Sequence, residues 1–322
     1  MSGMQNLRNT ILCGDCIEIL RKVNEPFADL IFADPPFNIG YQYDKYRDRV
    51  EKNRYLAWTR DWISACLGVL KPTGSFYIAI GDDYAAHVRL IGEDLGLTLR
   101  NWIIWHYTFG QQTRNKFARS HTHIFYFVKN PQQFTFNDWA VRVPSDRQLV
   151  YNDKRAQSCG KLPDDVWNTY SRVCGTFRER QGWHPCQMPE LLLARIISAS
   201  SNPGDCVLDP FIGSGTTAAA AFQLGREYCG IDISEEYVEN TRRRLADVKK
   251  SRTFSGLSMH EMLELKRLVF EIGRSADAYR TNEKLIFLLC RQFAVRMNNG
   301  KHYKPDLILS FLPEICPCQG RK

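Results

Sequence analysis

Several features that would assign this protein to a common class are missing from its sequence. No stretch reaches the roughly 20 consecutive apolar residues of a transmembrane helix, and residues 1–10 lack the apolar core of a secretory signal. The chain has 11 cysteines but no second Cys-x-x-Cys pair at zinc-finger spacing. These absences predict a cytoplasmic protein without a structural metal, whose cysteines are mostly small buried hydrophobic residues in a reducing compartment.

The sequence does contain enough apolar side chains for a large core, and an excess of positive charge. Hydrophobic residues make up 44% of the 322 residues and aromatic residues 12%, which excludes a largely disordered chain. The formal net charge of +8 suits a polyanionic partner such as nucleic acid, although many basic proteins bind none. A chain of this length forms one large α/β domain with an appendage, or two domains.

Apolar runs of strand length alternate with helical patterns over most of the chain. The predicted strands lie at 28–33, 75–80, 101–106, 123–128, 206–208 and 227–231. The predicted helices lie at 54–70, 84–95, 191–200, 216–224 and 235–248. This alternation predicts an α/β fold with an open, mostly parallel sheet and helices on both faces.

Two regions do not follow that alternation. Residues 134–186 are polar and poorly periodic, and they are too many for an ordinary connection. Residues 249–322 follow a basic joint and show helical patterns at 259–272 and 282–297. The apolar residues of these helices suit a core and a docking surface. A dimer contact or a DNA clamp is the alternative.

A glycine-rich segment after a predicted strand has the features of a nucleoside-binding loop. Gly213 and Gly215 let the backbone approach a ligand closely, and the helix that begins near Thr216 offers free N–H groups. Asp232 ends the following predicted strand, where a carboxylate can accept hydrogen bonds from ribose hydroxyls. Ala218 stands where the dinucleotide fingerprint has its third glycine, so the pattern does not demand a pyrophosphate. We therefore expect a nucleoside cofactor here.

The segment Asp34-Pro35-Pro36-Phe37 ends another predicted strand and should open onto the same edge of the sheet. The Asp34 carboxylate and the main-chain carbonyl of Pro35 can each accept one N–H of a base amino group. This directs the nitrogen lone pair toward an electrophilic methyl group, and the two prolines hold the acceptors in place. Phe37 offers a face on which an extruded base stacks. The alternative is a strand-ending turn with a packed aromatic side chain.

Several motifs, taken with their order, resemble a known family. The resembling segments are Asp34-Pro-Pro-Phe37, Asp209-Pro-Phe211-Ile-Gly213-Ser214-Gly215-Thr216 and Gly230-Ile-Asp232. They are similar to motifs of the S-adenosylmethionine-dependent DNA amino-methyltransferases, and the catalytic motif comes first, as in the permuted beta class. Between them, two further stretches resemble that class: Asp165-Val-Trp167 and His184-Pro185-Cys-Gln187-Met-Pro189. The resemblance covers roughly residues 9–248.

The resemblance implies a Rossmann-like, seven-stranded sheet that binds S-adenosylmethionine and a base flipped out of double-stranded DNA. It implies a catalytic domain over residues 1–248, with an irregular target-recognition region at about 107–183. The resemblance does not reach residues 249–322, which are expected from their helical patterns to form a small helical extension. The implied base-holding residues are Asp34, Pro35, Pro36 and Phe37. The implied cofactor-binding residues are Asp15, Asp209, Phe211, Gly213, Ser214, Gly215, Thr216, Asp232, His184 and Gln187.

One of these positions carries an alternative, and a neighbouring position departs from the family pattern. Asp15 follows the first strand, where an aspartate is also a common helix N-cap. Met188 stands where many family members carry a lysine, so a salt bridge to the cofactor carboxylate is not supplied there. The target base is also open. Family members with aspartate at the first motif position more often modify adenine N6. Asp34 therefore favours adenine as the target base, and cytosine N4 is the alternative.

Candidate DNA contacts lie in the irregular region. The stretch 107–119 is rich in side chains that bind bases or phosphates, which predicts contacts from Gln111, Arg114, Lys116 and Arg119. A solvated active-site loop is the alternative. By resemblance, 134–171 is the target-recognition region, with Arg142, Arg147, Lys154 and Arg155 as candidate contacts. His121 and His123 are expected to be structural, because histidines beside an apolar strand usually satisfy local hydrogen bonds.

Three other functions share part of this pattern. A nicotinamide dehydrogenase would use the glycine loop but leave the Asp34 motif without a role. An RNA- or protein-directed methyltransferase usually has the reverse motif order, and a DNA-binding module would not need the cofactor pocket. The sequence therefore predicts a cytoplasmic, nucleoid-associated DNA methyltransferase. It leaves open whether the chain forms a homodimer, and whether a separate restriction nuclease recognises the same site.

Overall fold

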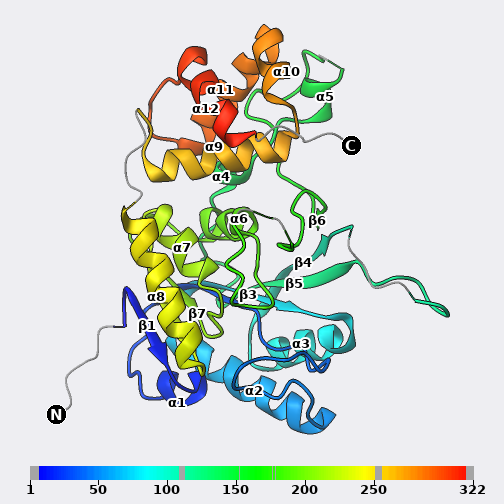
Figure 1. The fold of residues 1–322 in the computed structure, drawn as a ribbon, viewed down its shortest axis with the longest axis vertical. Coiled ribbons are helices and arrows are strands. Elements are labelled where there is room, and N and C mark those ends of the chain that lie inside the picture. The colour runs from blue at the N-terminus through cyan, green and yellow to red at the C-terminus, as the bar shows by residue number, and fades with distance from the viewer. Residues whose placement is uncertain are drawn as a thin grey trace.

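The computed structural model describes residues 7–108, 113–151, 153–175, 177, 179–250 and 256–316. One sheet carries helices on both faces, and a helical unit stacks above one of these layers (Figure 1). The strands are β1 Thr10–Cys13, β2 Ala28–Ala33, β3 Leu70–Ile80, β4 Thr98–His106, β5 His121–Val128, β6 Val166–Trp167, β7 Cys206–Asp209 and β8 Glu227–Asp232. The helices of the sheet layers are α1 Cys16–Leu20, α2 Lys52–Val69, α3 Asp82–Asp94, α6 Glu190–Ser200, α7 Thr216–Gln223 and α8 Glu235–Lys250.

The sheet has the order β1-β8-β7-β2-β3-β5-β4-β6. Neighbouring strands from β1 to β3 are parallel, and β5 is antiparallel to both β3 and β4. The predicted α/β fold with a mostly parallel sheet is therefore confirmed. An eighth strand in the described residues adds to the seven that the resemblance implies: the two-residue β6, which pairs with Ile104 and Trp105 of β4.

Alternate side chains of the central strands feed two separate cores. Phe76 and Ile78 of β3 are fully buried and pack with α2 and α3. Tyr77 and Ala79 point to the other face, where they pack against α6 and α7. This period of two is the geometry of a strand that is covered on both faces, and it explains why the strand residues are almost uniformly apolar.

Several element ends differ from the predicted ones by one to three residues, and one strand differs by more. The strand predicted at 75–80 begins at Leu70, directly after the helix that precedes it. Leu70 pairs with Ala28 of β2, and the next matched pair is Ser75 with Leu30. The residues between them bulge out of register while the backbone stays extended, so the helix stop and the strand start coincide. This pairing is a tertiary contact that the local sequence pattern does not contain.

The helical unit is built from two distant parts of the chain. Its C-terminal helices α9 Met259–Ile272, α10 Ala276–Thr281, α11 Glu283–Met297 and α12 Pro305–Ile315 enclose a core of their own. The short helices α4 Asp138–Val141 and α5 Asp146–Leu149, from the irregular insert, lie against them (Figure 1). Gln292 donates to the carbonyls of Arg142 and Cys159 at 3.2 and 3.1 Å. We call residues 137–161 with 257–316 the composite unit.

A buried cluster of charges joins the composite unit to the sheet layers. Arg195 on α6 binds Glu271 on α9 at 2.9 Å, and Arg296 on α11 binds the same carboxylate. Arg267 bridges Glu271 and Glu264 from within α9. Each of these five side chains is at most 5% exposed. The interface therefore depends on matched charges as well as on apolar packing.

The described part of the chain also bears on the expectations from cysteine and hydropathy. Cys66, Cys206, Cys229 and Cys290 are buried, as predicted, and the ten cysteines between residues 7 and 316 are unpaired thiols. Among the described helices, none is both long and apolar enough to cross a bilayer.

Candidate active site

Four carboxylates meet at one edge of the sheet. Asp34, Asp209 and Asp232 lie at the carboxyl ends of β2, β7 and β8, and Asp15 follows β1. These strands are adjacent and parallel, so their ends open onto a single pocket, which all four aspartates line. The space within it, counted out to its open mouth, is about 1020 Å³. Open α/β sheets commonly bind their ligands in this position.

The glycine loop forms one wall of the pocket and has a conformation that needs glycine. Gly213 and Gly215 have φ angles of 44° and 78°. A Cβ atom at Gly213 would lie 2.7 Å from Nε2 of His184, and one at Gly215 would lie 2.6 Å from Cγ2 of Thr241. The Gly213 N–H donates to Asp232 at 3.0 Å. The loop is therefore held close to both neighbours, with its backbone against the pocket.

Hydrogen bonds from behind fix the rest of this loop. The Ser214 and Thr216 hydroxyls lie 2.9 Å apart, and Arg244 on α8 donates to Thr216 and to the Ser214 carbonyl. The Phe211 ring packs edge-on against Trp62, with centroids 5.2 Å apart. The predicted loop residues that line the pocket are Asp209, Phe211, Gly213, Ser214 and Thr216. Gly215 is not a lining residue; it turns the chain behind the wall.

Burial and neighbouring negative charges raise the pKa of three aspartates of the pocket, Asp34, Asp209 and Asp232. Burial raises the pKa of Asp209 to about 7, although Thr217 and the Phe211 N–H donate to it. Burial and the neighbouring Asp209 likewise raise the pKa of Asp34 to about 7, against the opposing charge of Arg172. Burial also raises the pKa of Asp232. A cationic ligand would relieve this repulsion, so the carboxylates suit a positively charged partner.

Asp15 has two roles in the structure. Its carboxylate caps α1 by accepting from the Ile17 and Glu18 N–H groups at 2.7 and 3.2 Å. It also lines the pocket. The capping alternative and the pocket position are therefore compatible, because a carboxylate has more acceptor sites than these two bonds use.

His184 and Gln187 differ in their surroundings. His184 is 8% exposed, lines the pocket, and its Nδ1 has no hydrogen-bond partner among the described residues. Burial lowers its pKa to about 4, so the ring is neutral. Gln187 lies outside the pocket lining, and its amide joins the Gln181 N–H to the Glu179 carbonyl. Gln187 thus shapes the segment that carries His184.

Several other residues that form the walls of the pocket were not identified from the sequence. They come from the segment after the Asp34 motif and from two helices: Tyr43, Lys45, Tyr46, Trp58 and Tyr237. The segment folds over the pocket because Ser234 donates to Asp44 at 2.6 Å. Among the described residues that line the pocket, Lys45 is the sole lysine or arginine. The closely spaced tyrosines after the Asp34 motif could have indicated a pocket wall in the sequence. Trp58 could not, because it fits the apolar periodicity of the predicted helix at 54–70.

The Asp34 motif presents acceptors that other described residues leave unused. Neither the Asp34 carboxylate nor the Pro35 carbonyl accepts a hydrogen bond from the described chain. The Pro36 carbonyl accepts from the Tyr55 hydroxyl at 2.7 Å. Phe37 lies over Gly81, where a Cβ atom would approach its ring to 3.2 Å. Asp34 and Pro36 line the pocket together with the glycine loop, whereas Pro35 and Phe37 are not lining residues.

The candidate DNA contacts at 107–119 fall into three groups. Gln111 lies outside the described residues. Arg114 and Lys116 are exposed on the connection between β4 and β5, which projects from the body (Figure 1). Arg119 binds Asp82 at 2.9 Å and Asp83 at 3.0 Å. Its guanidinium therefore ties this connection to α3 and is engaged by the protein itself.

The other four candidates lie in the composite unit. Arg142 binds Asp138 at 2.6 Å and donates to the Gly160 carbonyl. Arg155 binds Asp153 at 3.0 Å. Arg147 and Lys154 are exposed, and their segment lies beside α10 and α11 (Figure 1). Arg142 therefore stabilises the local fold, and the other three are on the outer side of the composite unit.

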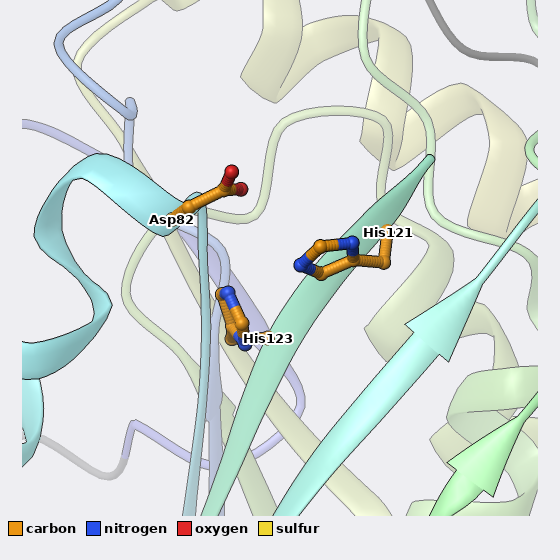
Figure 2. A group of neighbouring side chains, drawn as sticks. All are labelled: Asp82, His121 and His123. Carbon is orange, nitrogen blue, oxygen red and sulfur yellow. The ribbon is translucent and has the colours of Figure 1, made fainter. Parts of the chain in front are cut away.

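Asp82, His121 and His123 bring possible metal ligands within 4.8 Å of one another (Figure 2). Trp102 donates its indole N–H to Nδ1 of His123 at 2.9 Å, so the neutral ring carries its proton on Nε2. Asp82 is already paired with Arg119. Burial lowers the pKa of His123. The cluster therefore matches the expected structural role for His123, which accepts a local hydrogen bond.

Comparisons with known proteins agree with this geometry. A family model described as DNA methylase matches residues 28–243. The chain is 39% identical over 236 residues to the type II methyltransferase M.HpaI of Haemophilus parainfluenzae, covering 73% of each chain. It is 38% identical over 248 residues to the DNA adenine methyltransferase YhdJ of Escherichia coli, covering 74% of this chain and 83% of that protein.

A solved structure shares the arrangement. The crystal structure of the M1.HpyAVI–SAM complex aligns with a TM-score of 0.54 at 25% identity, over 73% of this chain and 98% of the other. On these grounds the chain belongs to the N6/N4 family of S-adenosylmethionine-dependent DNA methyltransferases.

Proposed function

We propose that this enzyme methylates the N6 amino group of adenine in double-stranded DNA, at a specific sequence. The observation that carries the proposal is the unused Asp34 carboxylate, which lines the same pocket as the glycine loop and is followed in the chain by the unused carbonyl of Pro35. An exocyclic amino group has two N–H donors, one for each acceptor. The aspartate of the motif and the relative named as an adenine methyltransferase favour adenine. Cytosine N4 is the second candidate, because the family modifies both bases.

The chain's residues would prepare the amino nitrogen for methyl transfer. S-adenosylmethionine supplies an electrophilic methyl group when bound. Asp34 and Pro35 would each accept a hydrogen bond from one N–H group and pull it out of the plane of the base. The nitrogen lone pair then points into the pocket. Phe37 supports the base by stacking. Asp34 accepts the proton that the nitrogen loses on methylation, for which a pKa of about 7 is suitable.

The same pocket would hold the cofactor along the strand ends. Asp232 is suited to the ribose hydroxyls and Asp15 to the adenine. Asp209 and the backbone of the glycine loop face the middle of the pocket. The unpartnered Nδ1 of His184 suits the methionine end. With Met188 in the pocket wall, no cation is supplied at that position.

The weakly acidic pocket predicts a pH dependence that distinguishes the cofactor from its product. The pKa values of Asp34 and Asp209 are both raised to about 7, so these groups become protonated below that pH. A sulfonium cation favours their ionised forms, whereas the thioether of S-adenosylhomocysteine carries no such charge. From pH 8 to pH 6 we expect S-adenosylmethionine affinity to fall about tenfold for each coupled carboxyl. Calorimetric titration with both ligands measures this; an equal pH dependence for the two would contradict it.

Nucleoside analysis decides the target base. DNA from cells that express the protein is sequenced by a single-molecule method, and its nucleosides are separated by mass spectrometry. N6-methyladenine at one short sequence is the expected result. Exclusive N4-methylcytosine would overturn the assignment to adenine but leave amino-methylation intact. Cells with an Asp34→Ala variant give the background.

Further partners are proposed on the same basis. The enzyme would act on chromosomal DNA in the cytoplasm, within the nucleoid. Protection of a site from a separate restriction nuclease is consistent with the type II relative, and resistance of the modified DNA to cleavage tests it. A homodimer is tested by light scattering of the purified protein.

A further inference from the structure

Arg172 stands apart from the other arginines near the pocket. It lies on the connection between β6 and α6 and is exposed. Its guanidinium carbon is 5.2 Å from the centroid of the Tyr107 ring. Tyr107 is itself fixed, because its hydroxyl bonds to the His121 carbonyl at 3.1 Å and to Thr122 at 3.2 Å. The guanidinium therefore stacks on an immobile aromatic surface.

The backbone that presents Arg172 is also held firmly. The Trp105 indole donates to the Tyr170 carbonyl at 2.7 Å, two residues earlier. The Tyr170 ring stacks with Phe270 of the composite unit at 6.1 Å, and Val173 is buried on the other side. A side chain on such a segment loses little conformational entropy on binding a ligand.

Arg172 has no carboxylate within ion-pair distance among the residues described. Arg119 and Arg155, in contrast, are paired with neighbouring aspartates. Arg172 is not one of the residues that line the pocket. It follows β6, and Tyr107 follows β4; both strands run parallel to β3, so their carboxyl ends lie at the edge of the sheet where the pocket opens. From there the charge of Arg172 opposes the rise in the pKa of Asp34 and of Cys186, which line the pocket. The exposed guanidinium is therefore available, near the pocket, to an anion from outside the protein.

We propose that Arg172 binds a backbone phosphate next to the extruded nucleotide and so positions the target base against Asp34. When a base enters the pocket, its sugar and phosphates remain at the mouth, where Arg172 lies. A planar guanidinium with several donors suits a phosphate, and its stacking on Tyr107 prearranges it. Arg172 is thus a positioning residue for the flipped base. The inference rests on the proposed function.

The first test compares Arg172→Gln and Arg172→Lys with Arg243→Gln, a matched loss of charge on the outer face of α8, where Arg243 is 71% exposed. Binding of a duplex with the mapped recognition site is measured over a range of salt concentrations. Arg172→Gln should bind about tenfold more weakly and lower the salt slope by about one. Arg172→Lys should keep the slope, and Arg243→Gln should match wild type. At pH 9, well above the pKa of about 7 of Asp34, S-adenosylmethionine affinity should be the same in all four proteins.

The second test identifies the phosphate. Each of the two phosphates that flank the target nucleotide is replaced, one at a time, by an uncharged methylphosphonate. At one of them, wild type should lose about tenfold in affinity, whereas Arg172→Gln should lose almost nothing further. Independent, additive losses at both positions would overturn the proposal, as would an unchanged salt slope. If Arg172→Gln does not fold, the same cycle with the uncharged Arg172→Met decides.

Failure of the proposed function is visible separately. If wild-type protein transfers no methyl group to any unmodified duplex, the reaction itself is assigned wrongly. If wild type methylates the duplex but shows no coupling between Arg172 and either phosphate, only the role of Arg172 is wrong.

Discussion

Replacement of Asp34 by alanine is expected to lower the rate of methyl transfer by about 10³-fold or more, while S-adenosylmethionine still binds. Removal of one preorganised group that stabilises the reacting atoms commonly costs 10²–10³-fold, and Asp34 also accepts the proton. Cofactor binding should survive because the glycine loop, Asp209 and Asp232 remain. Single-turnover methylation of duplex DNA measures the rate, and calorimetry measures the cofactor affinity.

Two variants control this experiment. Asp34→Asn keeps one carbonyl acceptor but cannot take the proton, so we expect a loss smaller than that of alanine. Asp61→Asn removes an exposed carboxylate on α2, which pairs with Arg21, and should leave the rate unchanged. Turnover of Asp34→Ala within tenfold of wild type would refute a catalytic role for Asp34.

The largest expected effect on stability is at Glu271. Its carboxylate is 1% exposed and lies between Arg195, Arg267 and Arg296, and it accepts from the Tyr170 hydroxyl. Glu271→Gln leaves three buried guanidinium groups with Glu264 as the one remaining carboxylate of the cluster. Breaking a buried pair in this way costs about 3–5 kcal/mol. Urea denaturation monitored by tryptophan fluorescence measures the free energy of unfolding.

The pH dependence of this contribution has a defined sign. Burial alone would raise the pKa of Glu271, but the three arginines lower it well below its usual value. The stabilisation is therefore complete above the unfolded pKa of about 4.3 and is lost only as the pH falls further. Glu239→Gln, at an exposed pair with Arg243, is the matched control and should change stability by less than about 1 kcal/mol. A loss below that limit for Glu271→Gln would show that the cluster does not stabilise the interface.

The Glu271 cluster also connects the composite unit with the active site. Tyr170, which it holds, lies two residues before Arg172. A variant at Glu271 that still folds should therefore weaken DNA binding more than cofactor binding. This gives the helical extension a supporting role that its own sequence does not reveal.

Elements with strong local signals were predictable from sequence. The strand at Ala28–Ala33 and the helix at Met259–Ile272 have the bounds that were expected. The strand is an unbroken apolar run, and the helix has a capping box between Ser258 and Glu261 and ends at Gly273, which has a φ of 67°. Such signals lie within a few residues of the element they define, so a single sequence contains them.

The chemistry of the strand ends was equally local. The Asp34 motif and the glycine loop are each contiguous, and both follow strands that the apolar runs identify. Parallel strands in one sheet bring their carboxyl ends to the same edge, so two distant motifs were expected in one pocket. The sequence by itself therefore determined the fold class, the order of the motifs and the family to which they point.

The roles of the arginines were decided by the tertiary structure alone. Arg119 and Arg172 are both basic residues in polar segments, and only Arg119 was expected to bind DNA. In the fold, Arg119 meets two aspartates of α3, whereas Arg172 stacks on Tyr107 and pairs with no carboxylate among the described residues. Whether a charge is available depends on partners that come from elsewhere in the chain. Local sequence does not encode those partners, because they are set by how the elements pack.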